Sequence, residues 1–577
     1  MTPTHRSVRR LALSFLLLAT VLAVTAAAAT PAPSAAGGEV LAYPSSRTVS
    51  GNALPDGGAR AIQLATGRGE REGAWIVAKG AGPIQATVDA GGLGPLRIEL
   101  AWAHFVHVGD SIVPDALVPW SGEARAAERP TQPLYVRVVV PREAAPGTYR
   151  GSVAVTVAGS TVTVPVEVRV FPFTQPLAGA GSLLTAFHVS PTTYLNTVAR
   201  VYGLTSTSQR RAANTALFRF LAEYGISPSS WGFGEPRSAS GYASSPKWWL
   251  DSATNMRDAV SAGTFGAMRI PISSNRTSSG HWIAGLSPSE PEGWCDYLRS
   301  VRGFWAENGW LTHSVPLLYA QDEPNLSGQR LVARQSKTLH QCWPGARSMM
   351  TGTPSPTGAN RFLYDGRNGD DLDVWVVLSR RYYGQFTPPA HQRSGNRARE
   401  LFSSIERIRK RASIWSYTYD GVAGTPGFRA DEPLSDPRML LLWNALEGVQ
   451  GLLYGQGVTS YDRANPLDRV SRHGEFVLAY PSPNGPIPSA RLEQIRDGME
   501  DWALLEAVRR ARGAARVRAI LGDTGLFSAD ARGVHLACRL GCELKSGTKY
   551  SWPHWSHDAS TAARIERARL AAFRAVG

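Results

Sequence analysis

Cysteine is scarce in this chain, with four residues among 577. None of the four has the spacing and paired histidines of a zinc site, and the sequence contains neither H-E-x-x-H nor G-x-S-x-G. These absences remove the usual signatures of a zinc metalloprotease and of an α/β-hydrolase. The Ser244-x-x-Lys247 motif lacks the companion motifs of a penicillin-binding serine hydrolase, and we interpret it as a loop. We expect no metal and no other cofactor.

Long apolar runs are missing beyond about residue 24. Residues 6–10 are basic, residues 11–24 are apolar and residues 25–36 are small, which is the order of a secretory signal peptide. An uncleaved anchor is the alternative, because this apolar run approaches the ~18 residues that span a bilayer. We expect a protein secreted by a bacterium, without stable membrane insertion once the signal peptide over residues 1–36 is cleaved.

Acidic residues are in the minority, with 46 Asp and Glu against 61 Lys and Arg. The formal net charge is +15, and the three arginines of the predicted signal peptide leave +12 on the remainder. This excess is diffuse and nearly all arginine, and no basic run is interleaved with stacking aromatics. We therefore expect no nucleic-acid partner. Affinity for anionic glycans or cell walls is compatible with the charge.

Valine-rich alternating runs fill residues 37–176, and regularly spaced turn signals separate them, which predicts a β-sandwich. Over residues 177–510, eight short apolar runs alternate with helical patterns, which predicts a (β/α)8 barrel of the TIM type. An open, doubly wound sheet is the alternative. Residues 511–577 are expected to form a helical extension packed on the barrel. The eight runs begin at Ser182, Gly225, Phe265, Ser314, Ala346, Asp373, Ala412 and Val449.

The strongest chemical signal is the pair Asp322 and Glu323, which follows an apolar run and precedes Pro324. Successive strand residues point to opposite faces, so adjacent carboxylates share a pocket only where the ladder breaks. Proline supplies such a break. Parallel barrels place their active sites at the carboxyl ends of strands, and two acids in different environments can serve as a proton donor and a lasting anion. We expect both acids to be catalytic, in glycoside hydrolysis.

The same tripeptide recurs at Asp431, Glu432 and Pro433. There it follows a loop and precedes a segment in which Ser435 or Asp436 can cap a helix. We interpret the second copy as a helix entry without a catalytic role.

Three motifs resemble glycoside hydrolase family 123, a secreted bacterial family with a barrel catalytic domain. They are "PGTYRGSVAVTV" in the β-rich front, "LLYAQDEP", and "GEFVLAYPSPNGPIPSARLEQIRDGMEDWALLEAV", in which a Tyr-Pro turn precedes an Arg-x6-Gly-x-Glu-Asp helix. The resemblance implies a retaining hydrolase of 2-acetamido sugars, typically β-linked N-acetylgalactosamine, in which the acetamido oxygen is the nucleophile. Asp322 would orient the acetamido group and stabilise the oxazolinium cation, and Glu323 would be the acid and base. The partner would be a glycan carrying such a sugar.

Aromatic residues at other strand ends are candidates for substrate binding. The run "IWSYTY" places Trp415 and Tyr417 on one strand face. The family resemblance favours a tyrosine here, and we expect Tyr417 to bond the acetamido group and Trp415 to be a sugar platform. Tyr319, Trp231 and His188 complete the set, and packing in the core is the alternative for each. A non-catalytic carbohydrate-binding or cell-surface protein is the alternative function.

Four cysteines in an exported protein are most simply interpreted as two disulfides. Cys295 and Cys342 lie in predicted helices on either side of the strand before Asp322, and neighbouring barrel helices would bring them together. Cys538 and Cys542 would form only a local clasp. Free buried thiols are the alternative for both pairs.

Overall fold

The structure is a computed structural model, and it describes residues 38–577 apart from 180, 232–255, 259, 262, 277–281, 288, 290, 356–360, 365–371, 380–402, 419–425, 462–463 and 528–558. The predicted signal peptide, the Ser244-x-x-Lys247 motif, Cys538 and Cys542 lie outside the described residues.

The N-terminal part is a sandwich of two mainly antiparallel sheets with a core of their own. The first sheet has the order β1 (Glu39–Pro44), β3 (Arg71–Lys79), β8 (Thr131–Val139), β5 (Arg97–Val108), with β6 (Ser111–Pro119) also on β5. The second has the order β2 (Ile62–Arg68), β10 (Ser160–Thr174), β9 (Gly147–Val157), β4 (Pro83–Gly92), β7 (Arg125–Ala126). In β10 buried valines alternate with more exposed residues, the pattern that predicted these strands.

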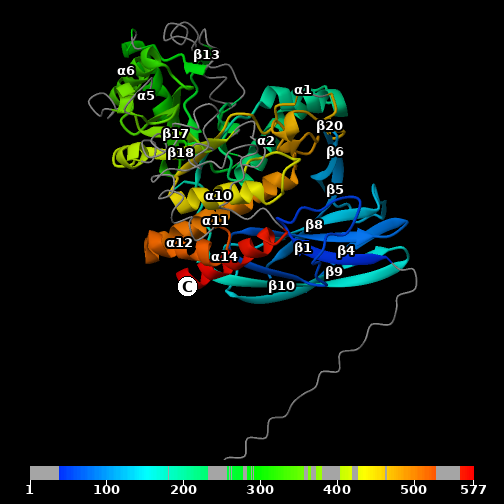
Figure 1. Cartoon of the computed structure of the whole chain (residues 1–577). Helices are drawn as coiled ribbons and strands as arrows, with labels where there is room; N and C mark the ends of the chain where they lie inside the picture. Colours follow the sequence, from blue (N-terminus) through cyan, green and yellow to red (C-terminus); the bar gives the residue numbers. More distant parts are fainter. Residues whose placement is uncertain are drawn as a thin grey trace, which may run out of the picture.

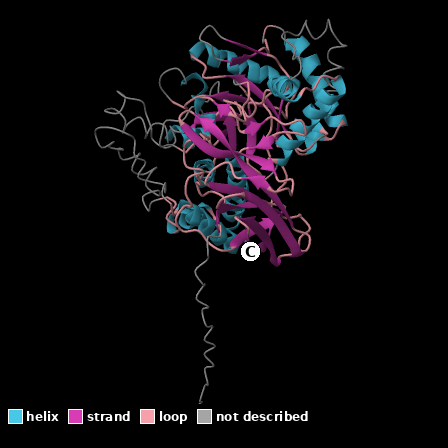
Figure 2. Cartoon of the chain, turned by 90° about the vertical axis from the view of Figure 1, so that its right-hand side faces the viewer, coloured by secondary structure: helices cyan, strands magenta, loops and turns pink. Residues whose placement is uncertain are grey.

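The second part is a nearly closed parallel barrel. Its strands follow the order β11 (Leu184–Phe187), β19 (Gly451–Tyr454), β18 (Ser413–Thr418), β17 (Val374–Leu378), β16 (Arg347–Thr351), β15 (Val315–Gln321), β12 (Ala267–Arg269). Every residue of β17 is buried, as expected for a parallel strand covered on both faces. Figure 2 shows these strands above those of the sandwich. The strands follow one another in sequence order around the sheet, and β12 contacts β11, so this is not an open, doubly wound sheet.

The barrel differs from the prediction at one position, because seven of the eight expected strands form in the part of the chain that the structure describes. The run from Gly225 contributes an isolated bridge at Pro228 between β11 and β12. The Phe187 N–H donates to the Ser227 carbonyl (2.9 Å), and the Ala267 N–H reaches only the Ser227 hydroxyl (3.1 Å). The Ser229 N–H donates back to the Phe187 carbonyl (2.8 Å), but Pro228 has no N–H to donate toward β12, so no ladder forms on that side.

Helices surround the barrel and separate it from the sandwich. Those within the described residues are α1 (Pro191–Tyr202), α2 (Thr207–Glu223), α5 (Pro291–Glu307), α6 (Leu326–Cys342), α7 (Arg361–Tyr364), α10 (Asp436–Glu447), α11 (Ala490–Arg512), α12 (Ala514–Asp523) and α14 (Thr561–Val576), with short 3-10 turns η1 (Trp310–Thr312) and η4 (Arg472–Gly474). In Figure 1, α10 and α11 cross the molecule between the barrel and the sandwich. Every residue of α10 is buried.

Three short pairings complete the strands. The hairpin β13 (Ser274–Arg276) and β14 (Trp282–Ala284) joins the end of β15 in antiparallel register. Beyond β19 the chain pairs β20 (Arg469–Val470) with β5 of the sandwich and then forms β21 (Ala479–Tyr480) with β22 (Ile487–Pro488). The segment that follows the last barrel strand is therefore docked on the sandwich.

Helix α11 carries the Arg-x6-Gly-x-Glu-Asp motif, and the motif lies in the interface of barrel and sandwich. Arg491 donates two hydrogen bonds to Asp115 of β6 (3.1 and 2.7 Å). Asp501 accepts from Arg438 of α10 (2.7 Å) and from Arg569 of α14 (2.5 Å). Gly498 lets α10 approach, because a Cβ there would lie 2.7 Å from Leu441.

The last helix, α14, differs in placement from the expected extension on the barrel. It contacts α11, α12 and the sandwich strands β2 and β10. Arg569 pairs with Glu70 and Glu72 of the sandwich, and Phe573 stacks on Phe171 at 4.7 Å between ring centroids. The C-terminus thus closes the side of the sandwich next to α11 (Figure 1).

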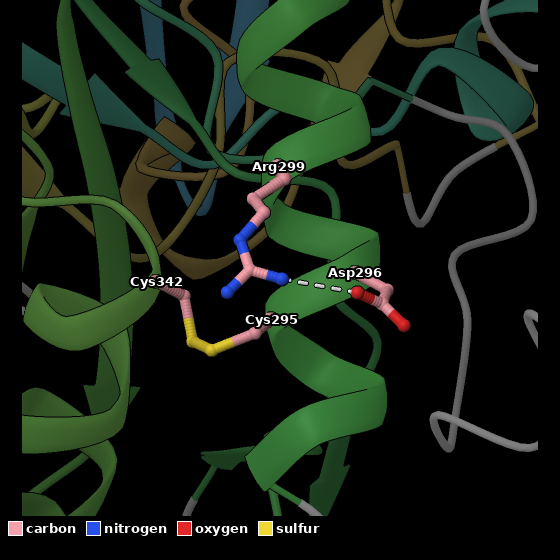
Figure 3. Close-up of a disulfide and its surroundings, with 4 residues drawn as sticks. All are labelled: Cys295, Asp296, Arg299 and Cys342. Carbon is pink, nitrogen blue, oxygen red and sulfur yellow. Dashed lines mark hydrogen bonds and ion pairs between the residues drawn. A yellow bond between two sulfur atoms is a disulfide. The ribbon is translucent and has the colours of Figure 1, made fainter.

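A disulfide joins α5 to α6. Cys295 and Cys342 are bonded, with their Cα atoms 4.7 Å apart. In Figure 3 the bridge lies between the two helices, beside an ion pair of Asp296 and Arg299 (3.1 Å) on α5. The bridge therefore fixes α5, which precedes the barrel strand β15, relative to α6, which follows it.

We expect peptide mapping without reduction to recover Cys295 and Cys342 in one cross-linked peptide. The double substitution C295S/C342S should lower the free energy of unfolding by about 2–4 kcal/mol, the usual contribution of a disulfide that closes a loop of this length. Denaturant unfolding of oxidised and substituted protein measures the difference. Two free thiols in the native protein would contradict the bridge.

The buried carboxylates around α11 make stability depend on pH in both directions. Burial raises the pKa of Glu72 to about 8, although Arg569 and Arg438 oppose the rise. Burial would also raise the pKa of Glu493, but Arg137 and Arg496 outweigh it and lower that pKa to about 2. Glu72 therefore loses stabilisation as pH rises from its unfolded pKa toward 8, and Glu493 loses it as pH falls toward 2.

We accordingly expect the melting temperature to be highest near pH 5 and to fall by roughly 3 °C or more at both pH 3 and pH 8. The substitution E72Q should flatten the alkaline side only, because glutamine keeps the neutral form that burial favours. Thermal melts of both proteins across this range are the measurement. A melting temperature that rose steadily up to pH 8 would contradict the raised pKa of Glu72.

Candidate active site

The two acids lie in the short connection between β15 and α6. A register irregularity follows Tyr319 in the pairing of β15 with β16, and such bulges re-aim the side chains beyond them. Glu323 then has a φ of +39°, which is rare for a residue with a side chain. Asn325 begins α6 by accepting a hydrogen bond from the Gly328 N–H (2.9 Å). The ladder therefore breaks at Asp322 and Glu323, ahead of Pro324.

Asp322 is held by two hydroxyl groups from the adjacent strands. Its Oδ1 atom accepts from the Tyr319 hydroxyl at 2.8 Å and from the Thr351 hydroxyl at 2.7 Å. Burial and the Asp322 carboxylate raise the pKa of Tyr319 well above its usual value, so the phenol keeps its proton and donates. Asp322 is thus oriented through one of its oxygens.

Glu323 has different partners. Its Oε1 atom accepts from the Tyr417 hydroxyl at 2.5 Å, and its backbone N–H donates to the Thr351 hydroxyl at 2.8 Å. Tyr417 lies on β18, beyond β16 and β17 in the barrel order, so the glutamate side chain extends over the barrel interior. The two adjacent acids therefore share one site and have separate side-chain contacts.

Tyr417 enters the site, where its hydroxyl group contacts Glu323, and its expected bond to an acetamido group stays a prediction. The side chain is 8% exposed, and its hydroxyl group donates a hydrogen bond to Glu323. A phenol has one proton, so Tyr417 cannot give the same proton to an acetamido oxygen while it holds Glu323. Tyr419, the last residue of the run "IWSYTY", lies outside the described residues.

Trp415 does not form a platform. It shares the inward face with Tyr417, as predicted, but it is 1% exposed inside the barrel. Its ring occupies the space that a Cβ at Gly451 would need, 2.2 Å away, which explains the glycine in the neighbouring strand. A buried indole offers no face to a sugar, so its burial favours the packing alternative for Trp415.

Trp231 is also buried, at 1% exposure, and it packs between helix and barrel. Its indole N–H donates to the Arg269 carbonyl (2.9 Å), and its ring packs against Phe218 and Phe265. His188 lies at the end of β11 and is half-buried, and burial together with Arg269 lowers its pKa. Trp231 thus belongs to the packing alternative, whereas His188 remains a binding candidate that is neutral at pH 7.

Two polar residues at strand ends were not predicted from the sequence. Thr351 ends β16 and touches both acids. Arg269 ends β12 and donates to the Ile272 carbonyl (2.9 Å) and the Ser274 hydroxyl (2.7 Å). Their position at the carboxyl ends of predicted strands was the available signal, because those ends meet at one edge of the barrel.

The second Asp-Glu-Pro has a different environment. Asp431 accepts from Arg429 (3.0 and 2.9 Å) and contacts His473 (2.7 Å), and Glu432 lies 3.7 Å from Arg429. Burial alone would raise the pKa of Asp431, but the hydrogen bonds with Arg429 and His473 outweigh burial and lower that pKa. This copy is an ion-paired entry to α10.

Within the described residues, no group of three or more His, Cys, Asp and Glu side chains is arranged to hold a metal ion. Over the same part of the chain, no helix is long and apolar enough to cross a bilayer.

Comparison with solved structures identifies the fold. A family 123 glycoside hydrolase from Clostridium perfringens, analysed for glycolipid glycan hydrolysis, aligns with a TM-score of 0.59 at 14% identity, over 87% of this chain and 96% of that one. The resemblance of the three motifs is thereby confirmed at the level of fold. No family model and no curated protein matches the sequence.

Two other glycoside hydrolases align with lower TM-scores. A β-D-glucuronidase of Dictyoglomus thermophilum aligns with a TM-score of 0.29 at 11% identity, over 75% of this chain and 66% of that one. A family 10 xylanase with an Ig-like domain, from termite gut, aligns with a TM-score of 0.30 at 9% identity, over 77% of this chain and 100% of that one.

Proposed function

We propose that the protein is a secreted bacterial glycoside hydrolase of the family 123 type that cleaves 2-acetamido sugars, β-N-acetylgalactosaminides in particular, with retention. The observation that carries the proposal is the pair of adjacent acids at the carboxyl edge of the barrel, each with its own side-chain contacts. The shared fold supports it. The partner is a glycan, and no cofactor takes part in the steps proposed.

Adjacent acids fit substrate assistance. In an ordinary retaining enzyme, two carboxyl groups lie on opposite sides of the scissile bond, because one must attack the anomeric carbon. When the acetamido oxygen attacks instead, the protein needs one proton donor and one anion. The anomeric C–O bond to the leaving group breaks as the oxazolinium ring forms, and water then opens that ring with net retention.

The contacts assign the two roles. Tyr417 donates to Oε1 of Glu323, so in the protonated acid the proton belongs on Oε2, from which it passes to the departing glycosidic oxygen. The same oxygen then takes a proton from the attacking water. Asp322, oriented by Tyr319 and Thr351, faces the acetamido N–H and the positive charge that develops on the ring.

The second Asp-Glu-Pro provides a matched control. On 4-nitrophenyl N-acetyl-β-galactosaminide, we expect E323Q and D322N to lower kcat/KM by about 10²-fold or more, whereas D431N and E432Q should leave it within about threefold. Melting curves check that each variant is folded. The E323Q loss should be larger on a disaccharide, because nitrophenolate departs with little help from a proton.

The opposite pattern, with D431N inactive and D322N active, would reject the assignment of the site. If wild-type protein turned over none of these substrates but bound a glycan, and D322N and E323Q bound it equally well, the protein would be the non-catalytic binder instead.

Substrate assistance predicts strong inhibition by a thiazoline analogue of N-acetylgalactosamine, which mimics the oxazolinium-like state. The variant D322A should lose more affinity for this analogue than for the product sugar. In the wild type, the Asp322 carboxylate lies against a positively charged ring only in the oxazolinium-like state. Inhibition constants for both ligands, with D431A as control, measure the difference. A covalent glycosyl-enzyme trapped with a 2-fluoro sugar would contradict substrate assistance, because it would show that a carboxylate of the protein is the nucleophile.

A further inference from the structure

We infer that Thr351 is a positioning residue that sets both acids through a single hydroxyl group. Its side chain is 1% exposed at the end of β16, and its Oγ1 atom lies 2.7 Å from Asp322 Oδ1 and 2.8 Å from the Glu323 nitrogen. The Tyr319 hydroxyl is 3.3 Å away. The kinetic part of this inference rests on the proposed function, and the structural part does not.

The directions of these hydrogen bonds follow from the number of protons. The Glu323 amide can only donate, so it uses a lone pair of the threonine oxygen. The one proton of Thr351 then points to Asp322, whose Oδ1 also receives the proton of Tyr319. Every proton in the set has one acceptor, and the threonine oxygen is the atom through which the orientation of Asp322 and the backbone of Glu323 are linked.

The amide contact matters because the backbone at Glu323 is strained. A φ of +39° costs free energy in a residue with a β-carbon, and such a conformation persists only where the surroundings impose it. This conformation turns Glu323 over the barrel, beside Asp322, rather than to the opposite face. Among the contacts of the described residues, the bond to Thr351 is the side-chain contact of this amide.

Threonine suits the task better than other hydroxyl residues. Its branched β-carbon restricts χ1, and strand packing on both sides of β16 leaves the side chain little freedom. The hydroxyl therefore holds a fixed position relative to β15. Tyr319 lacks this double function, since it bonds Asp322 and makes no contact with the Glu323 amide.

The test compares T351V, T351S and Y319F, with T131V as the control for loss of a buried threonine hydroxyl. Thr131 lies in the sandwich and donates to the Ser50 carbonyl at 2.7 Å. We expect T351V to lower kcat about 10- to 100-fold while KM changes less than about threefold, because misplaced acids weaken the transition state more than the bound substrate. T351S should restore kcat to within about threefold of wild type, and T131V should not change it.

Crystal structures of T351V and T351S provide a readout that needs no activity. In T351V the Asp322 carboxylate should turn and the φ of Glu323 should leave the positive region, whereas T351S should keep both. In Y319F the backbone of Glu323 should stay in place. Unchanged acids in T351V, or equal losses of kcat in T351V and T351S, would overturn the inference.

The outcomes for Thr351 and for the proposed function are separable. If wild-type protein proves inactive on 2-acetamido glycosides but T351V displaces both acids, the proposed function fails and the positioning role stands. If wild type is active and T351V retains both the geometry and kcat, the function stands and the positioning role fails.

Discussion

The structure depends on a buried set of ion pairs around α11. Asp501 joins Arg438 of α10 to Arg569 of α14, and Arg569 pairs in turn with Glu70 of the sandwich. Removing one partner from such a set leaves an unpaired charge in the interior, which typically costs about 3–5 kcal/mol. These contacts make the sandwich, the barrel and the last helix one unit rather than three parts joined by linkers.

The same helix positions the barrel strands that carry the site. The Trp502 indole of α11 donates to the Val449 carbonyl, just before β19, at 2.9 Å. Through the close crossing at Gly498, α11 also places α10, whose Asn444 donates to Ser416 of β18 at 2.9 Å. The next residue is Tyr417, which holds Glu323. The ion pairs thus fix one side of the site, and Thr351 fixes the other.

Period-two and helical patterns predicted the order of the elements well, because burial dictates both patterns. These patterns gave wrong or incomplete predictions where the chemical identity of a single residue determines the local structure. Pro228 interrupts a run that looks like a strand, and Trp415 has the alternation of a site residue but fills the space above Gly451. The Arg-x6-Gly-x-Glu-Asp tail was the most distinctive motif, yet its charges bond other elements of the interface, which no local pattern reveals.

The sequence predicted where the candidate site lies on the barrel, but it did not predict the backbone conformation of that site. Asp322, Glu323 and Pro324 marked a broken ladder in the sequence, whereas the positive φ of Glu323 had no signal, since glycine is the residue that usually marks it. This conformation of Glu323 lets two consecutive acids, Asp322 and Glu323, face the same site. With ordinary strand geometry the second acid would face the helices, and with glycine there would be no second acid. The substrate-assisted mechanism that we propose tolerates a short separation between acid and anion, so under it a strained turn supported by one threonine would supply both from consecutive residues.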